Sequence, residues 1–153
     1  MPGITKLIGI YDADGGIFGE IKYFAGKIFS NKHCSLCDIT HGKSKNEWAQ
    51  CEKRLPITID FIHLNERNSA IEKYTKGVTP CVIGKTATGY VTLVNKNEMN
   101  ECGGNAKKFE ALIRQKLQNQ FLAIVNYNLM MIVLVVFKYF HSLSWELTTL
   151  LLV

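Results

Sequence analysis

A stretch of 17 residues near the end of the chain, residues 121 to 137 (FLAIVNYNLMMIVLVVF), carries no charged side chain. Only Asn126, Tyr127 and Asn128 interrupt its apolar residues. A helix needs about 20 apolar residues, and at least about 17, to cross the hydrocarbon core of a bilayer. We therefore divide the chain into a mixed-charge domain over residues 1 to 118 and an apolar tail over residues 119 to 153, and we expect the tail to be a helix that spans a membrane through residues 121 to 137.

Basic residues on the two sides of this stretch predict its orientation. Only Lys138 follows it closely, whereas four basic residues precede it: Lys107, Lys108, Arg114 and Lys116. Because positive charge stays on the cytoplasmic side, we expect a cytoplasmic domain anchored to the inner membrane. Two alternatives stay open. The tail could pack as amphipathic or buried helices on the domain or on a partner, or it could be appended by a reading-frame error.

Composition narrows the class of protein. The five cysteines are an odd number, and the opening residues MPGITKLIGIYDADGG lack the features of a signal peptide. Both observations indicate a reducing compartment in which thiols stay free, bind metal or cycle. The net charge of +5 is spread along the chain without basic runs interleaved with aromatic residues. We therefore expect no nucleic-acid binding.

Apolar periodicity and turn residues predict an α/β domain. The predicted strands cover residues 5 to 11, 57 to 64, 81 to 86 and 89 to 94, the last two forming a hairpin. Helices are predicted over residues 17 to 29, 69 to 76 and 105 to 117. We interpret residues 30 to 54 as a loop with a short helical turn. The resulting order is β-α-β-α-β-β-α, followed by the apolar C-terminal helix.

This order resembles that of thioredoxin-like domains, in which an α/β half is followed by a hairpin and a closing helix. Thr79-Pro80, directly before a predicted strand, resembles the place where such proteins carry a cis-proline. Tyr11, Asp12 and Asp14 in KLIGIYDADGG match the start of the small bacterial DCC-type thiol-disulfide oxidoreductase-like family. That family continues with a Cys-x-x-Cys, where this chain has residues 15 to 18, GGIF. The resemblance therefore implies the fold and does not carry over the catalysis.

The combination of YDADGG, HCSLCDITHG and TPCVIG also looks like a group of short bacterial proteins without an assigned activity. Within it, Cys34-Ser-Leu-Cys37 is the motif most informative about chemistry. Two cysteines at this spacing can form a disulfide, and His33 beside them could lower a thiol pKa. The first hypothesis is thiol-disulfide exchange, with Cys34 as the more exposed nucleophile, Cys37 as the resolving thiol and Pro80 shaping the site. Against it, the pair follows the first predicted helix and does not precede it.

The same residues support a second hypothesis, a non-catalytic binding module. His41 follows Cys37 at the spacing C-x2-C-x3-H, and His63 could add a fourth ligand, which would suit tetrahedral zinc. The fourth ligand would come from far along the chain, and His63 in an apolar strand is also typical of a hydrogen-bonded core histidine. In the third interpretation, Cys34 and Cys37 are small packing residues, and the protein holds no cofactor.

Overall fold

The computed structural model describes residues 3 to 15 and 34 to 150, with side chains described as far as residue 138. Within these ranges the strands β1 (Lys6–Ile10), β2 (Ile59–Ile62), β3 (Cys81–Thr86) and β4 (Gly89–Val94) form one mixed sheet in the order β2-β1-β3-β4. β1 runs parallel to β2 and antiparallel to β3, and β3 and β4 form the hairpin. The predicted strands and α/β class are confirmed. The helix predicted over residues 17 to 29 lies outside the described residues.

Two helices, α2 (Ser35–Thr40) and α3 (Lys45–Glu52), occupy the segment predicted to be a loop with a short helical turn. The second helix was not predicted, because it is short and has little apolar pattern. In α3 only Trp48 and Cys51 are buried, among charged and polar neighbours. The helix α5 (Lys96–Glu101) was not predicted either. Its start is fixed by a capping box in which Asn95 and Glu98 bond to each other's backbone N–H groups.

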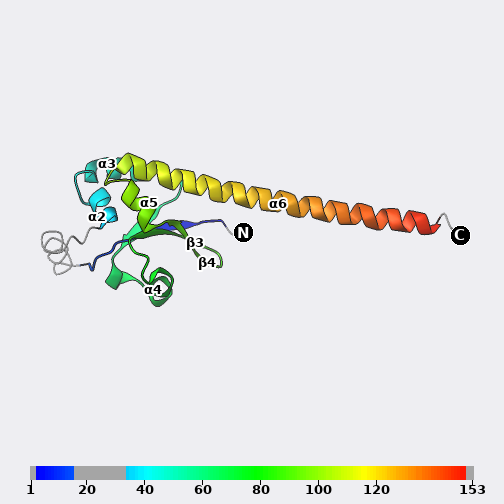
Figure 1. Cartoon of the computed structure of the whole chain (residues 1–153), viewed down its shortest axis with the longest axis horizontal. Coiled ribbons are helices and arrows are strands. Elements are labelled where there is room, and N and C mark those ends of the chain that lie inside the picture. The colour runs from blue at the N-terminus through cyan, green and yellow to red at the C-terminus, as the bar shows by residue number, and fades with distance from the viewer. Residues whose placement is uncertain (1–2, 16–33, 151–153) are drawn as a thin grey trace.

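Helices cover both faces of the sheet (Figure 1). On one face, α2, α3, α5 and the first turns of α6 (Ala106–Leu150) enclose the larger core, which includes Leu36, Trp48, Met99 and Phe109. On the other face, α4 (Ser69–Thr75) packs through Ile71 onto Ile8, Ile10, Cys81 and Ile83. A short 3₁₀ turn, Leu64–Glu66, follows β2. The alternation of side chains along β1 and β3 thus supplies both cores.

The apolar tail continues the closing helix without a break. The sequence predicted a helix ending near Leu117 and a separate tail, but α6 is one helix of 45 residues, about 67 Å long at 1.5 Å per residue. Phe109 and Ile113 on its first turns are fully buried. From Phe121 onward the helix leaves the domain as a single rod (Figure 1), and the large apolar side chains from Phe121 to Phe137 are exposed with the exception of Ile124.

Among the described residues, α6 is the one helix long and apolar enough to cross a membrane, with a mean hydropathy of 2.0 over its most apolar window and none of that window buried. An exposed apolar surface of this extent needs a covering that water does not provide. The C-terminal helix is therefore a candidate membrane anchor.

Candidate functional site

Cys34 and Cys37 form a disulfide across the first turn of α2, with their Cα atoms 5.3 Å apart. Cys34 is the N-cap of this helix, and its Sγ accepts a hydrogen bond of 3.3 Å from the backbone N–H of Cys37. The pair therefore lies at the start of a helix, within the segment for which the sequence predicted a loop with a short helical turn. A sulfur at an N-cap receives a backbone N–H that has no partner inside the helix.

Both members of the disulfide are buried. Cys34 is 2% exposed and Cys37 is 7% exposed, so the prediction that Cys34 is the more exposed of the two was wrong. Leu36 and Ile39 of α2 are fully buried in the larger core, to which both cysteines also belong. Between them, the hydroxyl of Ser35 is buried and has no hydrogen-bond partner among the described residues. A buried polar atom without a partner marks a place that packing alone does not explain.

Tyr11, just beyond the end of β1, joins α2 to the sheet. Its hydroxyl bonds the hydroxyl of Thr40 on α2 at 3.0 Å, and its ring stacks on that of Phe61 at 5.7 Å. Gly9 makes room for Phe61, because a Cβ there would lie 2.5 Å from the Phe61 ring. Burial raises the pKa of Tyr11 to about 12. The hydroxyl therefore stays protonated at neutral pH and acts as a hydrogen-bonding group.

The two histidines predicted as metal ligands both lie against Tyr11. The ring centroid of His41 is 5.2 Å from that of Tyr11, and the centroid of His63 is 4.8 Å from it. His63 follows β2 and caps the 3₁₀ turn, where its Nδ1 lies 3.0 Å from Oε2 of Glu66. Hydrogen bonds from the backbone and ring of His63 hold the pKa of Glu66 below its usual value. His63 is thus hydrogen-bonded, although at the end of the strand and not inside it.

No group of three or more His, Cys, Asp or Glu side chains gathers at metal-binding distance in residues 3 to 15 and 34 to 138. The donors of the zinc hypothesis fall into separate arrangements, with Cys34 bonded to Cys37 and the two histidine rings tilted against the ring of Tyr11. A structural zinc site needs four ligands converging on one point. The described residues therefore do not fit zinc as they are arranged.

Pro80 lies immediately before β3, is fully buried, and follows a cis peptide bond with Thr79. This is the position at which the thioredoxin-like resemblance places such a bond. The hydroxyl of Thr79 donates a hydrogen bond of 2.8 Å to Oδ1 of Asp12, which follows Tyr11. Asp12 also pairs with Lys96 on α5, at 3.5 Å. Asp12 therefore links the segment after β1 to the residue pair before β3 and to α5.

All five cysteines fall within the described residues, and three of them are buried free thiols, Cys51, Cys81 and Cys102. Burial raises the pKa of each, that of Cys81 to about 11. Cys81 faces the smaller core around Ile71, whereas Cys34 and Cys37 belong to the larger core on the opposite face. Buried thiols with raised pKa values are poor nucleophiles. We interpret all three as packing residues.

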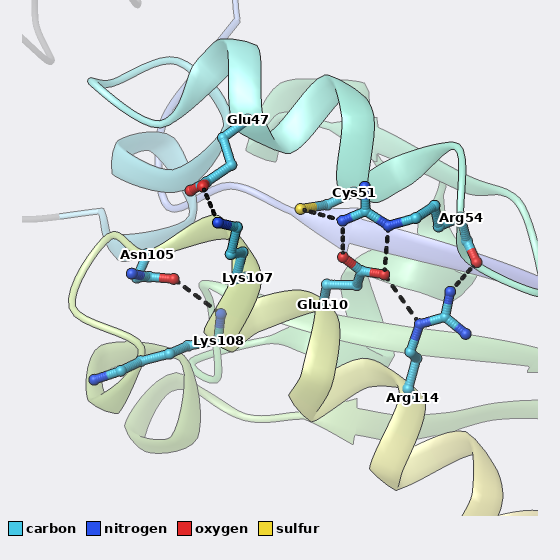
Figure 2. A network of polar contacts seen from close by, with 8 residues as sticks. All are labelled: Glu47, Cys51, Arg54, Asn105, Lys107, Lys108, Glu110 and Arg114. Carbon is cyan, nitrogen blue, oxygen red and sulfur yellow. Dashed lines mark hydrogen bonds and ion pairs between the residues drawn. The ribbon is translucent and has the colours of Figure 1, made fainter.

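A second polar cluster, which the sequence analysis missed, joins α3 to the base of α6 (Figure 2). Arg54 donates two hydrogen bonds to the Glu110 carboxylate, 3.2 Å from Nε to Oε1 and 2.5 Å from Nη2 to Oε2. Arg114 donates to Glu110 at 3.0 Å and to the carbonyl oxygen of Arg54. Arg54 also lies 3.2 Å from Sγ of Cys51. The spacing of Glu110 and Arg114 along one helix was the available signal, but no sequence pattern indicated Arg54, which follows α3, as their partner.

Comparison with known proteins adds no relative, since no family model, curated protein or solved structure matches the chain. Function must therefore be argued from the residues and their arrangement.

Proposed function

We propose that this chain is a membrane-anchored thiol-disulfide exchange protein with a thioredoxin-like fold, in which Cys34 and Cys37 are the redox pair. The observation that carries the proposal is the disulfide across the first turn of α2, where Cys34 is the N-cap and its sulfur receives the Cys37 N–H. The hydrogen bond favours the thiolate form of Cys34 over the protonated thiol.

The topology supports the thioredoxin-like part of the proposal. The parallel pair β1 and β2 forms the α/β half, β3 and β4 form the hairpin, and α6 closes the domain. Pro80 takes up the position before β3 that the resemblance gives to a cis-proline. The redox pair differs from the family pattern, because it begins α2 and does not follow β1 directly.

The proposed reaction passes two electrons between a substrate dithiol and the protein disulfide. A substrate thiolate attacks Sγ of Cys37, the more exposed of the two, and forms a mixed disulfide while the Cys34–Cys37 bond breaks. Cys34 leaves as a thiolate that keeps the Cys37 N–H as its hydrogen-bond donor. A leaving thiolate stabilised in this way speeds exchange. The second substrate thiol then displaces Cys37, which yields a substrate disulfide and a protein dithiol.

In this proposal, attachment through α6 holds the thiol-disulfide exchange site close to a membrane surface. The basic residues at the base of α6 outnumber Lys138 beyond the apolar stretch, which supports a domain on the cytoplasmic side of the inner membrane. In a reducing compartment the pair is mostly dithiol, so the exchange described above runs there in reverse: a substrate disulfide is reduced and the Cys34–Cys37 pair is oxidised.

The alternative is a non-catalytic binding module in which the disulfide only holds α2 in place. Near-complete burial of both cysteines is the observation that favours it. Disulfide reduction by the full chain in mild detergent, followed with a small chromogenic disulfide, separates the two. The exchange proposal predicts that Cys34→Ser and Cys37→Ser each abolish turnover.

Cys102→Ser is the matched control, because the serine hydroxyl can keep the hydrogen bond that Cys102 donates to the carbonyl oxygen of Glu98. This variant should retain the activity of the unmodified chain. Absence of turnover in the unmodified chain, with the disulfide formed and the domain folded, would support the binding module.

A further inference from the structure

We propose that α6 pairs with α6 of a second copy of this chain, through a stripe formed by Leu122, Asn126, Leu129, Val133 and Val136. The proposal goes beyond thiol exchange and does not depend on it. These five residues follow one another at spacings of three and four along a single helix, the pattern of a two-helix seam. All five side chains are exposed.

Asn126 is the reason for assigning the pairing to this face of α6. In a helix surrounded by lipid or packed on apolar residues, a side-chain amide without a partner is costly. An amide is self-complementary, since it both donates and accepts hydrogen bonds, and it can therefore satisfy its own copy across a two-fold axis. Asparagine at a seam position is a known determinant of register and of pairing in helix dimers. Asn119, seven residues earlier, continues the same face toward the domain.

The position of the domain on α6 leaves this face open. Ile113 is fully buried and marks the side of the helix that packs on the core. At about 100° per residue, Asn126, Leu129 and Val133 lie about 160 to 220° around the helix from Ile113, on the opposite side. Asn128 lies only about 60° from Ile113, and Lys138 falls on the same side. A second helix that packs against the stripe through Asn126 would therefore contact neither of the two domains. Lys138 would lie on the far side of the helix from this contact.

The length of α6 suffices for such a contact. From Asn119 to its end at Leu150 the helix has 32 residues, and about four in seven of them, roughly 18, face the partner in a helix pair. Stable interfaces use about 20 to 30 residues a side, so the pair comes close to the lower end of that range. The sequence also extends the seam spacing with apolar residues beyond the exposed stripe, at Phe140, Leu143, Leu147 and Leu150.

Energy transfer between full chains labelled at the N-terminal amine, in phosphatidylcholine vesicles over a range of protein-to-lipid ratios, tests the proposal. Asn126→Leu should require about a 5- to 30-fold higher ratio for half-maximal transfer than the unmodified chain, since it loses the hydrogen bond between helices. Asn128→Leu is the matched control, because it removes an identical amide two residues away on the domain side. It should leave the transfer curve unchanged.

Three results would overturn the pairing. The unmodified chain could show no transfer above that of randomly placed molecules at any ratio. Asn128→Leu could weaken transfer as much as Asn126→Leu, or all three chains could give the same curve. Circular dichroism of each vesicle sample establishes that the helix content is equal, so that a lost signal reports association.

Discussion

The carboxylate of Glu110 on α6 accepts two hydrogen bonds from the guanidinium of Arg54, which directly follows α3, and Glu110 is only 8% exposed. This pair joins the end of α3 to α6, the helix that leaves the domain as a candidate membrane anchor. Glu110→Gln should lower the free energy of unfolding by roughly 1 to 3 kcal/mol, because it removes a buried charged acceptor from two arginines. Chemical denaturation in detergent measures this change.

The ion pair of Lys107 and Glu47 is the natural control for that substitution, because it also joins α6 to α3. It is far more exposed, with side-chain exposures of 75% and 38%. Exposed pairs contribute about 0 to 1 kcal/mol. Glu47→Gln should therefore have little effect, and an equal loss in both variants would contradict the role given to Glu110.

Acid stability should depend on the same carboxyl group. The two arginines hold the pKa of Glu110 at about 2, below its ordinary value of 4.5. A carboxyl whose pKa is lower in the folded state stabilises the fold above its unfolded pKa, and this contribution is lost as the pH falls toward the folded pKa. Unfolding free energy should therefore decline between about pH 4.5 and about pH 2, and Glu110→Gln should flatten the decline. An unchanged slope in that variant would assign the acid sensitivity to other groups.

Ser35→Ala should stabilise the oxidised protein by about 1 kcal/mol, because it removes a buried hydroxyl that has no partner among the described residues. Thermal unfolding of the oxidised chain provides the measurement. Ser44→Ala serves as the contrast, because its hydroxyl donates a hydrogen bond of 2.7 Å to the carbonyl oxygen of Gly104 and its loss should destabilise. If Ser35→Ala were as destabilising as Ser44→Ala, the hydroxyl would have a partner after all.

Membrane attachment predicts sensitivity to charge within α6. Ile132 and Val135 are exposed in the apolar stretch, and a lysine near the centre of a spanning helix costs about 2.5 to 3.5 kcal/mol. The double variant Ile132→Lys and Val135→Lys should move the chain from the carbonate-resistant membrane fraction to the soluble or aggregated one. Glu72→Lys, which changes the net charge equally on exposed α4, should stay with the membrane. Equal fractionation of both would argue against a membrane span.

The sequence predicted the strands well because β1, β3 and β4 have continuous apolar or β-branched runs bounded by turn residues. It failed between residues 34 and 52, where α2 and α3 have only six and eight residues and are too short to show a clear helical repeat of apolar residues. The Cys34–Cys37 pair was predictable from its spacing alone. Its burial was not, because the burial depends on how α2 lies against Tyr11 and the sheet, a tertiary contact between residues 29 positions apart, Tyr11 and Thr40.

In the candidate site, too, the local features were predictable from the sequence and the tertiary contacts were not. Cys34, Cys37 and His41 are close in sequence, and their spacing indicated redox chemistry for the cysteine pair and zinc for all three. The contact of both His41 and His63 with Tyr11 depends on β1 and β2 lying next to each other. No local pattern contains that information. The hydrogen-bonded pair of Arg54 and Glu110, which are 56 residues apart, was not predicted for the same reason.

Redox titration tests the central claim most directly. The full chain is equilibrated in detergent with glutathione buffers of increasing oxidising strength, quenched with acid and alkylated after unfolding, and mass spectrometry then counts the modified cysteines. We predict that Cys34 and Cys37 lose reactivity together at one potential, while Cys51, Cys81 and Cys102 are alkylated throughout. Alkylation of Cys34 and Cys37 across the whole range, or pairing of either with another cysteine, would contradict the account.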